Sequence, residues 1–501
     1  MARPLLSITL LLLVSSALAV NYPVDFRRPE IIPAPQRLDY RADTAVRLDN
    51  ATSFIVECPA DGARTLAAEK LRHFFDIDAP AVSVRPDAGA AARLGAEGYA
   101  LAAKGGEIIF SANALQGLRH ALSTLRQAAE RESAGLAVRT YCVPELAVQD
   151  KPALRFRALH LCWFPEQSTT FIERAIRLAG YYKFNFVVLE CWGTFRSARH
   201  PFLSLPGARL DAAEAHRLAA VAADCGITLV PQVNILGHAS LSRVASGKHV
   251  TLDLDKSRQP LFEPYNGWNW CLSNPDAAEV VCDFVDEVHE AFGRPAYFHV
   301  GCDEGDPPTC ARCRAARPYA KLIGTHIARV ATRLREHGAR ILVWHDMLLK
   351  KGDSRWEGFY ANGDEDAETL LDALPQDAII CDWHYGAPHT AYPTLDHFAS
   401  RGFDVLTCPF FDEDGIAAQG AYAQRKGLLG LMETSWAEAS GQKFARRIEA
   451  AACAAWGEQR EKTGRRQGGL LFYTHWRQCG WDMGVNDFAE AGVERDQMSW
   501  R

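Results

Sequence analysis

Two adjacent carboxylates, Asp303 and Glu304, follow an apolar segment that begins at Tyr297, and Gly305 comes directly after them. An apolar run of this kind is typical of a buried strand, and barrel enzymes hold catalytic groups at the C-terminal ends of such strands. Most Asp-Glu pairs are solvated loop charges, so the interpretation of this one depends on its partners. Side chains alternate along a strand, so the two carboxylates converge only where the backbone leaves strand geometry, which Gly305 permits.

The carboxylate pair belongs to a series of alternating strands and helices that starts at residue 154. Eight such units predict a (β/α)8 TIM barrel. A doubly wound open sheet is the rival fold, but the first strand lacks a glycine-rich phosphate turn after it. The expected strands are 156–161, 186–190, 227–233, 296–301, 340–344, 378–383, 404–408 and 428–433.

We divide the chain into a signal peptide (1–19), a small α+β N-terminal domain (20–150) and the catalytic barrel with a C-terminal tail (151–501). The N-terminal domain shows short strands, two helices (63–75 and 117–129) and no convergent ionisable cluster, so we expect a structural role. The leader combines Arg3, an apolar run and Ala17-Leu18-Ala19, which predicts an exported protein, periplasmic or secreted.

The composition limits the classes of binding partner that we expect. The 501 residues are 48% hydrophobic and 23% charged with a net charge of −6, which is typical of a globular protein and argues against nucleic acid or an anionic membrane surface. After the leader, no apolar run is long enough to predict a membrane span.

The chain has fourteen cysteines, and several of them adjoin apolar strands, where a buried free thiol is the expected state. Cys310 and Cys313 form the only closely spaced pair. They could form a local disulfide or half of a zinc site, but no second pair with zinc spacing is present, so we expect neither a metal nor another cofactor.

Polar and aromatic side chains stand at the C-terminal ends of the expected strands. This face would collect carboxylates, a histidine and several indoles, a combination that suits a sugar, because a sugar ring stacks on aromatics while its hydroxyls need polar partners. Each residue alone has a structural explanation, but indoles at corresponding ends of separate strands favour a binding wall. The residues are Glu190, His238, Asp303, Glu304, Trp344, Asp346, Trp383, Trp436 and Glu438.

The segment from His299 to Glu304 resembles the H-x-G-x-D-E signature of glycoside hydrolase family 20, the β-N-acetylhexosaminidases, and its cysteine-containing form is similar to the hexosaminidase D-like branch. The resemblance extends over most of the chain, from Glu97-Gly-Tyr-Ala-Leu through Gly237-His238 to Trp436-Ala-Glu438.

This resemblance implies that Glu304 is the general acid and that Asp303 holds a substrate 2-acetamido group whose carbonyl oxygen attacks the anomeric carbon. Ionised Asp303 would stabilise the cationic intermediate. The remaining roles are also implied: Trp344, Trp383 and Trp436 would wall the sugar, Arg157 would donate to its hydroxyls, and His238 would support the acid.

The chain departs from the family pattern in two places. Glu190 stands near where many members carry His-x-x-Asp, and it would take over the hydroxyl contact. The tyrosine that usually binds the acetamido carbonyl has no match, since Phe410 and Phe411 stand there, and Tyr385 is a candidate replacement. Two functions are therefore open: an exo-acting β-N-acetylhexosaminidase acting on terminal GlcNAc or GalNAc of glycans, or a sugar-binding protein that has lost turnover on the same scaffold.

Overall fold

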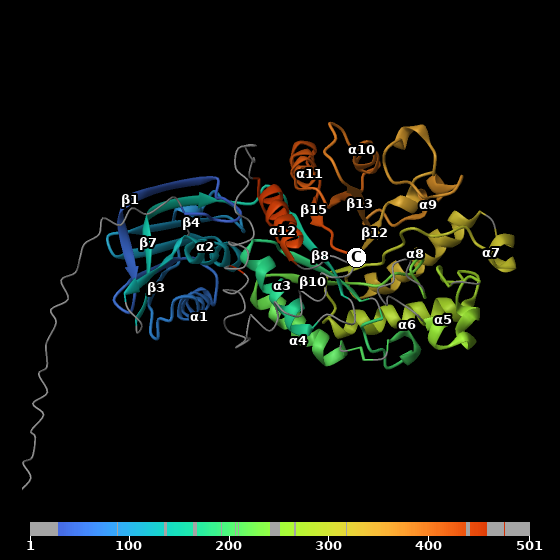
Figure 1. Cartoon of the computed structure of the whole chain (residues 1–501), viewed down its shortest axis with the longest axis horizontal. Helices are drawn as coiled ribbons and strands as arrows, with labels where there is room; N and C mark the ends of the chain where they lie inside the picture. The colour runs from blue at the N-terminus through green and yellow to red at the C-terminus, as the bar shows by residue number, and fades with distance from the viewer. Residues whose placement is uncertain are drawn as a thin grey trace, which may run out of the picture.

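The structure is a computed structural model, which describes residues 29–87, 89–134, 138–163, 168–191, 193–205, 207–208, 210–240, 251–264, 267–316, 318–436, 441–457 and 475. It contains an N-terminal sheet domain and a barrel, side by side in Figure 1. The expected signal peptide and Glu438 lie outside the described residues. In the described part of the chain, no helix has both the length and the apolar character needed to cross a membrane.

The N-terminal domain is a mixed sheet whose strands run in the order β1-β7-β4-β5-β2-β3, with β6 paired to β7. Helices α1 (Ala63–Phe75) and α2 (Leu115–Ala128) contact each other and pack against this sheet, and their apolar side chains share its core. The strands are β1 (Arg37–Leu48), β2 (Ser53–Glu57), β3 (Ala81–Arg85), β4 (Tyr99–Lys104), β5 (Glu107–Ala112), β6 (Glu130–Ala134) and β7 (Val138–Asp150).

Eight parallel strands close into a barrel, which confirms the predicted (β/α)8 fold. Strand β15 pairs with β8 to close it, and Gly430 is required at this seam, because a Cβ there would lie 1.8 Å from the carbonyl oxygen of Phe156. The strands are β8 (Phe156–Trp163), β9 (Phe186–Cys191), β10 (Thr228–Gln232), β11 (Tyr297–His299), β12 (Arg340–Trp344), β13 (Ile379–Tyr385), β14 (Asp404–Phe410) and β15 (Gly430–Glu433).

Helices surround the barrel, and two short ones, α5 and α7, lie in loops at its C-terminal end. Many of the long helices begin at a side-chain cap, such as Ser168 before α3, whose hydroxyl accepts from the N–H of Phe171. The helices are α3 (Thr169–Tyr181), α4 (Ala212–Asp224), α5 (Thr251–Leu254), α6 (Pro275–Ala291), α7 (Ala311–Ala315), α8 (Tyr319–Glu336), α9 (Ala367–Ala373), α10 (Pro393–Ser400), α11 (Glu413–Lys426) and α12 (Gly441–Trp456).

Strand alternation separates an inner cluster from an outer one. On β8, Phe156 and Ala158 belong to the small cluster that fills the barrel, whereas Leu159 and Leu161 belong to the large cluster between strands and helices. Arg157 shares the outward-facing side with Leu159. Both faces of the strand are buried, so polarity alone could not have shown which way Arg157 points.

The amino end of the barrel meets the N-terminal domain through buried charges. Arg157 donates to the carbonyl oxygens of Lys183 and Leu154 and forms an ion pair with Glu97. The Lys183 ammonium lies 3.1 Å from Asp150 Oδ2. Glu97 and Asp150 thus each pair with a cation that the barrel supplies, a contact that the N-terminal sequence alone did not indicate.

Candidate active site

The backbone turns sharply where β11 delivers the carboxylates. The strand ends at His299, and Gly301, Cys302 and Glu304 then have φ values of 65°, 72° and 47°. Positive φ at two residues with side chains is strained backbone of the kind found at functional sites. The sequence-based choice of Gly305 as the departure point is wrong, since the backbone departs from strand geometry from Gly301 onward.

This turn brings both carboxylates to one imidazole. His238 Nε2 lies 3.2 Å from Asp303 Oδ2 and 3.6 Å from Glu304 Oε2. The side chain of Asp303 is 9% exposed and that of Glu304 is 36% exposed, so the first is buried while the second reaches toward solvent. Asp303 Oδ1 is buried and has no hydrogen-bond partner among the described residues. The pair thus offers one orphaned acceptor and one accessible acid.

Asp346, which follows β12, holds the turn in place. Its Oδ2 accepts from the backbone N–H of Glu304 at 2.9 Å and from Asn362 Nδ2 at 2.8 Å, and its Oδ1 accepts from Trp383 Nε1 at 3.2 Å. Burial, together with the nearby charge of Asp303, raises the pKa of Asp346. Asp346 is therefore a positioning residue for Glu304 and Trp383.

Trp268 is a supporting residue that the sequence analysis missed. Its Nε1 donates to the carbonyl oxygen of Glu304 at 2.7 Å, and its ring lies 4.3 Å from the His238 ring between centroids. It stands in the long loop after β10, where no periodicity marks it. Its position two residues before Trp270, which donates to the Asn234 carbonyl, shows that indoles fix this loop against the barrel.

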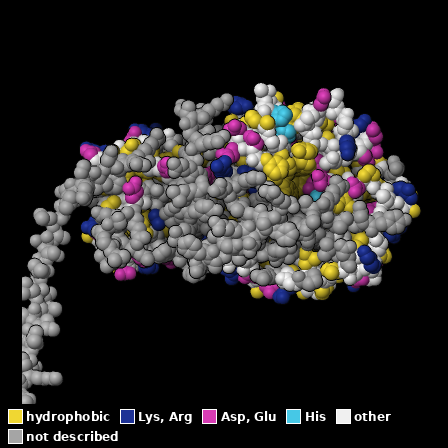
Figure 2. Space-filling model, viewed as in Figure 1, with side chains coloured by type: hydrophobic (Ala, Val, Ile, Leu, Met, Phe, Trp, Pro, Cys, Tyr) yellow, Lys and Arg dark blue, Asp and Glu magenta, His cyan; other side chains and the backbone are white. Residues whose placement is uncertain are grey.

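Aromatic rings form a wall beside the carboxylates. The Trp344 and Trp436 ring centroids are 5.8 Å apart, and Tyr360 lies 4.1 Å from Trp383. Trp436 Nε1 donates to the hydroxyl of Tyr385 at 2.9 Å. In the view of Figure 2, hydrophobic and acidic side chains gather beside each other over the barrel. The structure thus brings together the three indoles that the sequence analysis grouped.

Tyr385 stands in this wall, and Phe411 lies at its exposed rim. Burial raises the pKa of Tyr385, and the charge of Asp303 adds to the effect, so its hydroxyl stays protonated and can donate. Phe411 is 59% exposed, and its ring centroid lies 5.9 Å from that of Tyr385. The candidate replacement for the missing tyrosine is therefore placed at the site, with the aromatic residue after β14 beside it.

Below the wall lies a buried polar layer. Glu190 Oε1 accepts from Asn234 Nδ2 at 2.9 Å, and its Oε2 lies 3.3 Å from His160 Nε2. His160 was not predicted, because a lone histidine in an apolar strand gives no signal. Its ring contacts those of Trp344 and Trp436. Several buried polar atoms of this layer have no hydrogen-bond partner among the described residues: His160 Nδ1, Gln232 Oε1, His299 Nε2 and Trp344 Nε1.

Arg157 is the one described site residue that the structure places elsewhere. It lies on the outer side of β8 at the amino end, and its guanidinium donates to two backbone carbonyls and forms an ion pair with Glu97. The expectation that it donates to a sugar at the carboxylates is therefore wrong. Glu438 lies outside the described residues, so its role stays a prediction.

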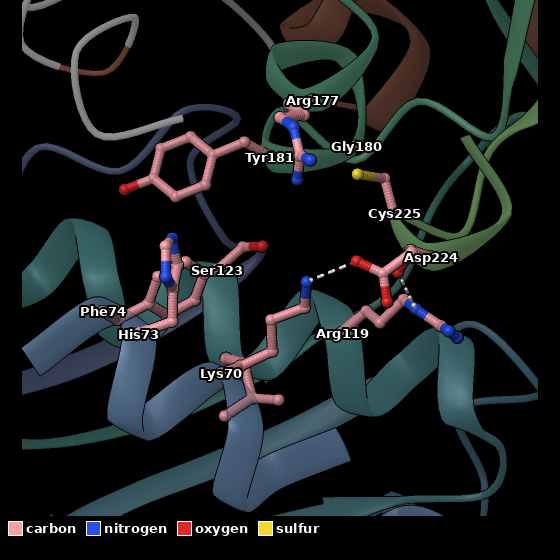
Figure 3. Close-up of a pocket in the computed structure, with 11 residues that line it drawn as sticks. Lys70, His73, Phe74, Arg119, Ser123, Arg177, Gly180, Tyr181, Asp224 and Cys225 are labelled. Atoms are coloured by element: carbon pink, nitrogen blue, oxygen red, sulfur yellow. Dashed lines mark hydrogen bonds and ion pairs between the residues drawn. The ribbon is translucent and has the colours of Figure 1, made fainter. Parts of the chain in front are cut away.

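A separate pocket opens between the two domains, shown in Figure 3. Its charged side chains are matched to one another: Lys70 Nζ lies 2.9 Å from Asp224 Oδ2, and Arg119 Nε donates to the Asp224 carbonyl. It lies against α1, α2 and α3, away from the ends of the barrel strands that carry the carboxylates. This pocket therefore belongs to the domain interface.

Cys310 and Cys313 have partners that the sequence spacing did not reveal. Cys271 and Glu263, from the loop after β10, lie beside them, and one ligand atom from each of the four side chains lies within 4.8 Å of the others. The lack of a second closely spaced pair in the sequence therefore did not exclude further candidate ligands in the fold.

The chain matches known proteins over both domains. The profile of "Glycosyl hydrolase family 20, domain 2" matches residues 28–151, and that of "Glycosyl hydrolase family 20, catalytic domain" matches residues 205–463. A beta-hexosaminidase from Vibrio furnissii is 24% identical over 423 residues, which are 76% of this chain and 62% of that protein. The chain thus spans less than two thirds of that relative.

Solved structures share the fold at low sequence identity. An exo β-N-acetylglucosaminidase from Vibrio harveyi has a TM-score of 0.66 at 18% identity, with 93% of this chain and 78% of that chain covered. A β-N-acetylhexosaminidase from Bacteroides fragilis has a TM-score of 0.64 at 19% identity, with 91% and 96% covered. Because the catalytic-domain profile alone spans more than half of the sequence and contains Asp303 and Glu304, the chain belongs to glycosyl hydrolase family 20.

Proposed function

We propose that the protein is an exported, exo-acting β-N-acetylhexosaminidase that removes terminal N-acetylglucosamine or N-acetylgalactosamine from glycans by a substrate-assisted, retaining mechanism. The observation that carries this proposal is Asp303 Oδ1, a buried acceptor that finds no hydrogen-bond partner in the described part of the chain, beside an accessible acid. A buried polar atom left without a partner costs free energy, so such an atom marks a place where a ligand donor belongs. The amide N–H of an acetamido group supplies that donor.

In this mechanism Asp303 accepts from the substrate amide and turns the acetamido carbonyl oxygen toward the anomeric carbon. The amide nitrogen becomes positively charged as the ring closes, and ionised Asp303 stabilises that charge in a site shielded from water. The nucleophile belongs to the substrate, so no glycosyl–protein bond forms. His238, 3.2 Å from Asp303 Oδ2, holds the other carboxylate oxygen in place.

Glu304 protonates the glycosidic oxygen as the bond to the leaving group breaks, and then takes a proton from the water that opens the cyclic intermediate. Its partial exposure suits both steps, because the leaving group and the incoming water approach from solvent. Two hydrogen bonds fix the backbone that carries the Glu304 side chain. The Glu304 N–H donates to Asp346, and Trp268 Nε1 donates to the Glu304 carbonyl.

The filled barrel closes the floor of the site. The polar layer around Glu190 and His160 lies beneath the indole wall, and side chains such as Phe156 and Val188 fill the barrel below it. A sugar would therefore bind at the mouth of the barrel, and the exo action that we propose rests on the likeness to an exo-acting enzyme of the same family.

Nitrophenyl glycosides test the proposal. We expect release of nitrophenol from the N-acetyl-β-glucosaminide or the N-acetyl-β-galactosaminide, and none from the matched β-glucoside, because its 2-hydroxyl cannot form the cyclic intermediate. A thiazoline analogue of that intermediate should inhibit. Equal hydrolysis of the glucoside, or a sugar trapped on a protein carboxylate, would contradict the mechanism; binding of the free sugar without any hydrolysis would show a binding protein.

A further inference from the structure

A cluster of three thiols and one carboxyl lies between two loops at the carboxyl end of the barrel. Glu263 and Cys271 come from the loop that joins β10 to α6, and Cys310 and Cys313 come from the loop that joins β11 to α8. Glu263, Cys271 and Cys313 are buried and Cys310 is half-buried. This cluster takes no part in the sugar chemistry above.

The sulfur atoms are spaced as metal ligands. Cys271 Sγ lies 3.8 Å from Cys310 Sγ and 3.8 Å from Cys313 Sγ. A disulfide would hold a pair at about 2.05 Å. Zinc–sulfur bonds of about 2.3 Å at tetrahedral angles separate two sulfurs by roughly 3.8 Å. Because Cys271 Sγ lies at this distance from both other sulfurs, the spacing favours one metal ion bound by all three thiolates over a disulfide between any two.

The Glu263 carboxyl group lies beside the thiols and is held by backbone donors. Its Oε2 accepts from the backbone N–H groups of Thr309 and Cys310 at 2.8 Å and 2.7 Å. Its Oε1 is buried and has no hydrogen-bond partner within the described residues. A carboxylate that is oriented through one oxygen and lies beside three thiols is the arrangement of a metal ligand held by outer hydrogen bonds.

The surroundings also suit thiolates. The backbone N–H of Cys313 donates to Cys310 Sγ at 3.2 Å, and Arg312 Nη2 lies 3.9 Å from Cys271 Sγ. An N–H donor and a guanidinium both stabilise negative charge on sulfur, which metal binding requires.

We propose that Glu263, Cys271, Cys310 and Cys313 bind one Zn²⁺ ion as a closed structural site. Four protein ligands leave no open position, so the ion has no catalytic role. It fastens the loop that carries His238 and Trp268 to the loop that begins with Asp303 and Glu304.

Hydrogen bonds already join these loops near the cluster. Asn269 Nδ2 donates to the Asp306 carbonyl at 2.7 Å, and the Asp306 N–H donates to Asn269 Oδ1 at 3.2 Å. Thr309 Oγ1 also donates to Glu263 Oε2 at 3.2 Å. The ion would cross-link these two loops at the outer edge of their contact. Its loss should make the position of the Glu304 backbone less rigid.

Metal analysis of the full-length protein, purified without chelator, tests the proposal. We expect about one zinc per chain, and cobalt exchanged into the protein should give thiolate-to-cobalt charge-transfer absorption together with intense tetrahedral d–d bands. Chelation should lower Tm, and zinc should restore it. Absence of metal both as purified and after incubation of the reduced protein with zinc would overturn the proposal. So would a mass two hydrogens low, with a disulfide mapped to Cys271, Cys310 or Cys313.

Variants locate the ion. Cys310→Ser and Glu263→Gln should lose most of the bound zinc and the cobalt spectrum, while Cys282→Ser, a buried thiol of α6 outside the cluster, should keep both. If Cys310→Ser fails to fold, Glu263→Gln, which keeps the shape of the side chain, still gives the result. Full zinc content and an unchanged cobalt spectrum in either folded variant would contradict the assignment.

Discussion

The two ends of the barrel bury charge in opposite ways. At the amino end, Arg157 faces Glu97 and two carbonyls, and Lys183 faces Asp150, so each buried ion has partners. At the carboxyl end, Asp303 keeps one oxygen that none of the described residues pairs with. Matched buried charge holds two domains together, whereas unmatched buried polar atoms leave room for a ligand to supply the partner.

This contrast shows which buried polar residues should be assigned to ligand binding or catalysis. A buried arginine near a strand end and a buried aspartate near another strand end look equivalent in a sequence, and both were assigned to sugar binding. In the structure, Arg157 lies at the amino end with its donors satisfied, whereas Asp303 lies at the carboxyl end with Oδ1 lacking a hydrogen-bond partner among the described residues. Each of the following tests should act on one end and leave the other unchanged.

The largest effect is expected from Glu304→Gln, which removes the proton donor at the carboxyl end. Turnover should fall by roughly 10²- to 10⁴-fold, and a better leaving group should restore part of it, because such a group departs without protonation. Tm should stay near that of the wild type. Steady-state kinetics on nitrophenyl and dinitrophenyl glycosides measure this, and a variant insensitive to the leaving group would remove Glu304 from the role.

At the amino end, Arg157→Met should act on stability instead. It leaves two buried carbonyls without their donor and Glu97, whose side chain is 26% exposed, without its cation, so the free energy of unfolding should fall by about 1–3 kcal/mol, while kcat and KM of the folded enzyme stay unchanged. Denaturant unfolding measures it. Arg335→Ala, which removes an exposed ion pair with Asp377, is the control and should cost less than about 1 kcal/mol. A raised KM for Arg157→Met would return Arg157 to the sugar site.

Asp346→Asn should have an intermediate effect on kcat, because Asp346 does not act on the substrate but positions the backbone of Glu304 and the ring of Trp383. An amide offers one oxygen where Asp346 uses two, so one of its N–H donors from Glu304, Asn362 or Trp383 loses its acceptor. A lost acceptor of this kind costs about 1–3 kcal/mol, so kcat should fall by roughly tenfold to a hundredfold. Unchanged kcat would show that the Glu304 backbone needs no such support.

The smallest expected effect is on the pH dependence of stability, through two titratable groups at the domain interface. Burial lowers the pKa of His120 to about 4, against an ordinary value of 6.5. Burial alone would raise the pKa of Glu97, but His120 and Arg157 lower it to about 2, from 4.5. Both groups bind fewer protons when folded, so stability should fall on acidification, between pH 6.5 and 4 for His120 and between 4.5 and 2 for Glu97.

Thermal unfolding across this pH range checks the assignment. His120→Gln should flatten the dependence of Tm on pH in the upper window, and Glu97→Gln should flatten it in the lower one. Dependences that match the wild type in both windows would show that the two groups do not titrate with unfolding.

The barrel could be predicted because eight apolar strands recur with helices between them, and the ends of those strands indicated the carboxylates and indoles. Strands β1 and β7 were missed because exposed polar residues interrupt their pattern, as in β1. His160 and Trp268 have no local signal, since their meaning comes from contacts across the barrel. Glu263 joins Cys310 across 47 residues, a separation that no spacing rule for metal ligands covers.

The contact between the start and the end of the barrel constrains how the chain is made. Ala153 and Leu154 donate backbone hydrogen bonds to the carbonyls of Trp456 and Ala455, and the Trp456 indole donates to Asp150. While the ribosome is still adding the last strand and helix, the first barrel strand has β9 on one side but lacks both β15 on the other side and this tie to the linker. Closure is therefore a late event in synthesis, and the nascent chain must keep an open, apolar sheet from aggregating until α12 emerges.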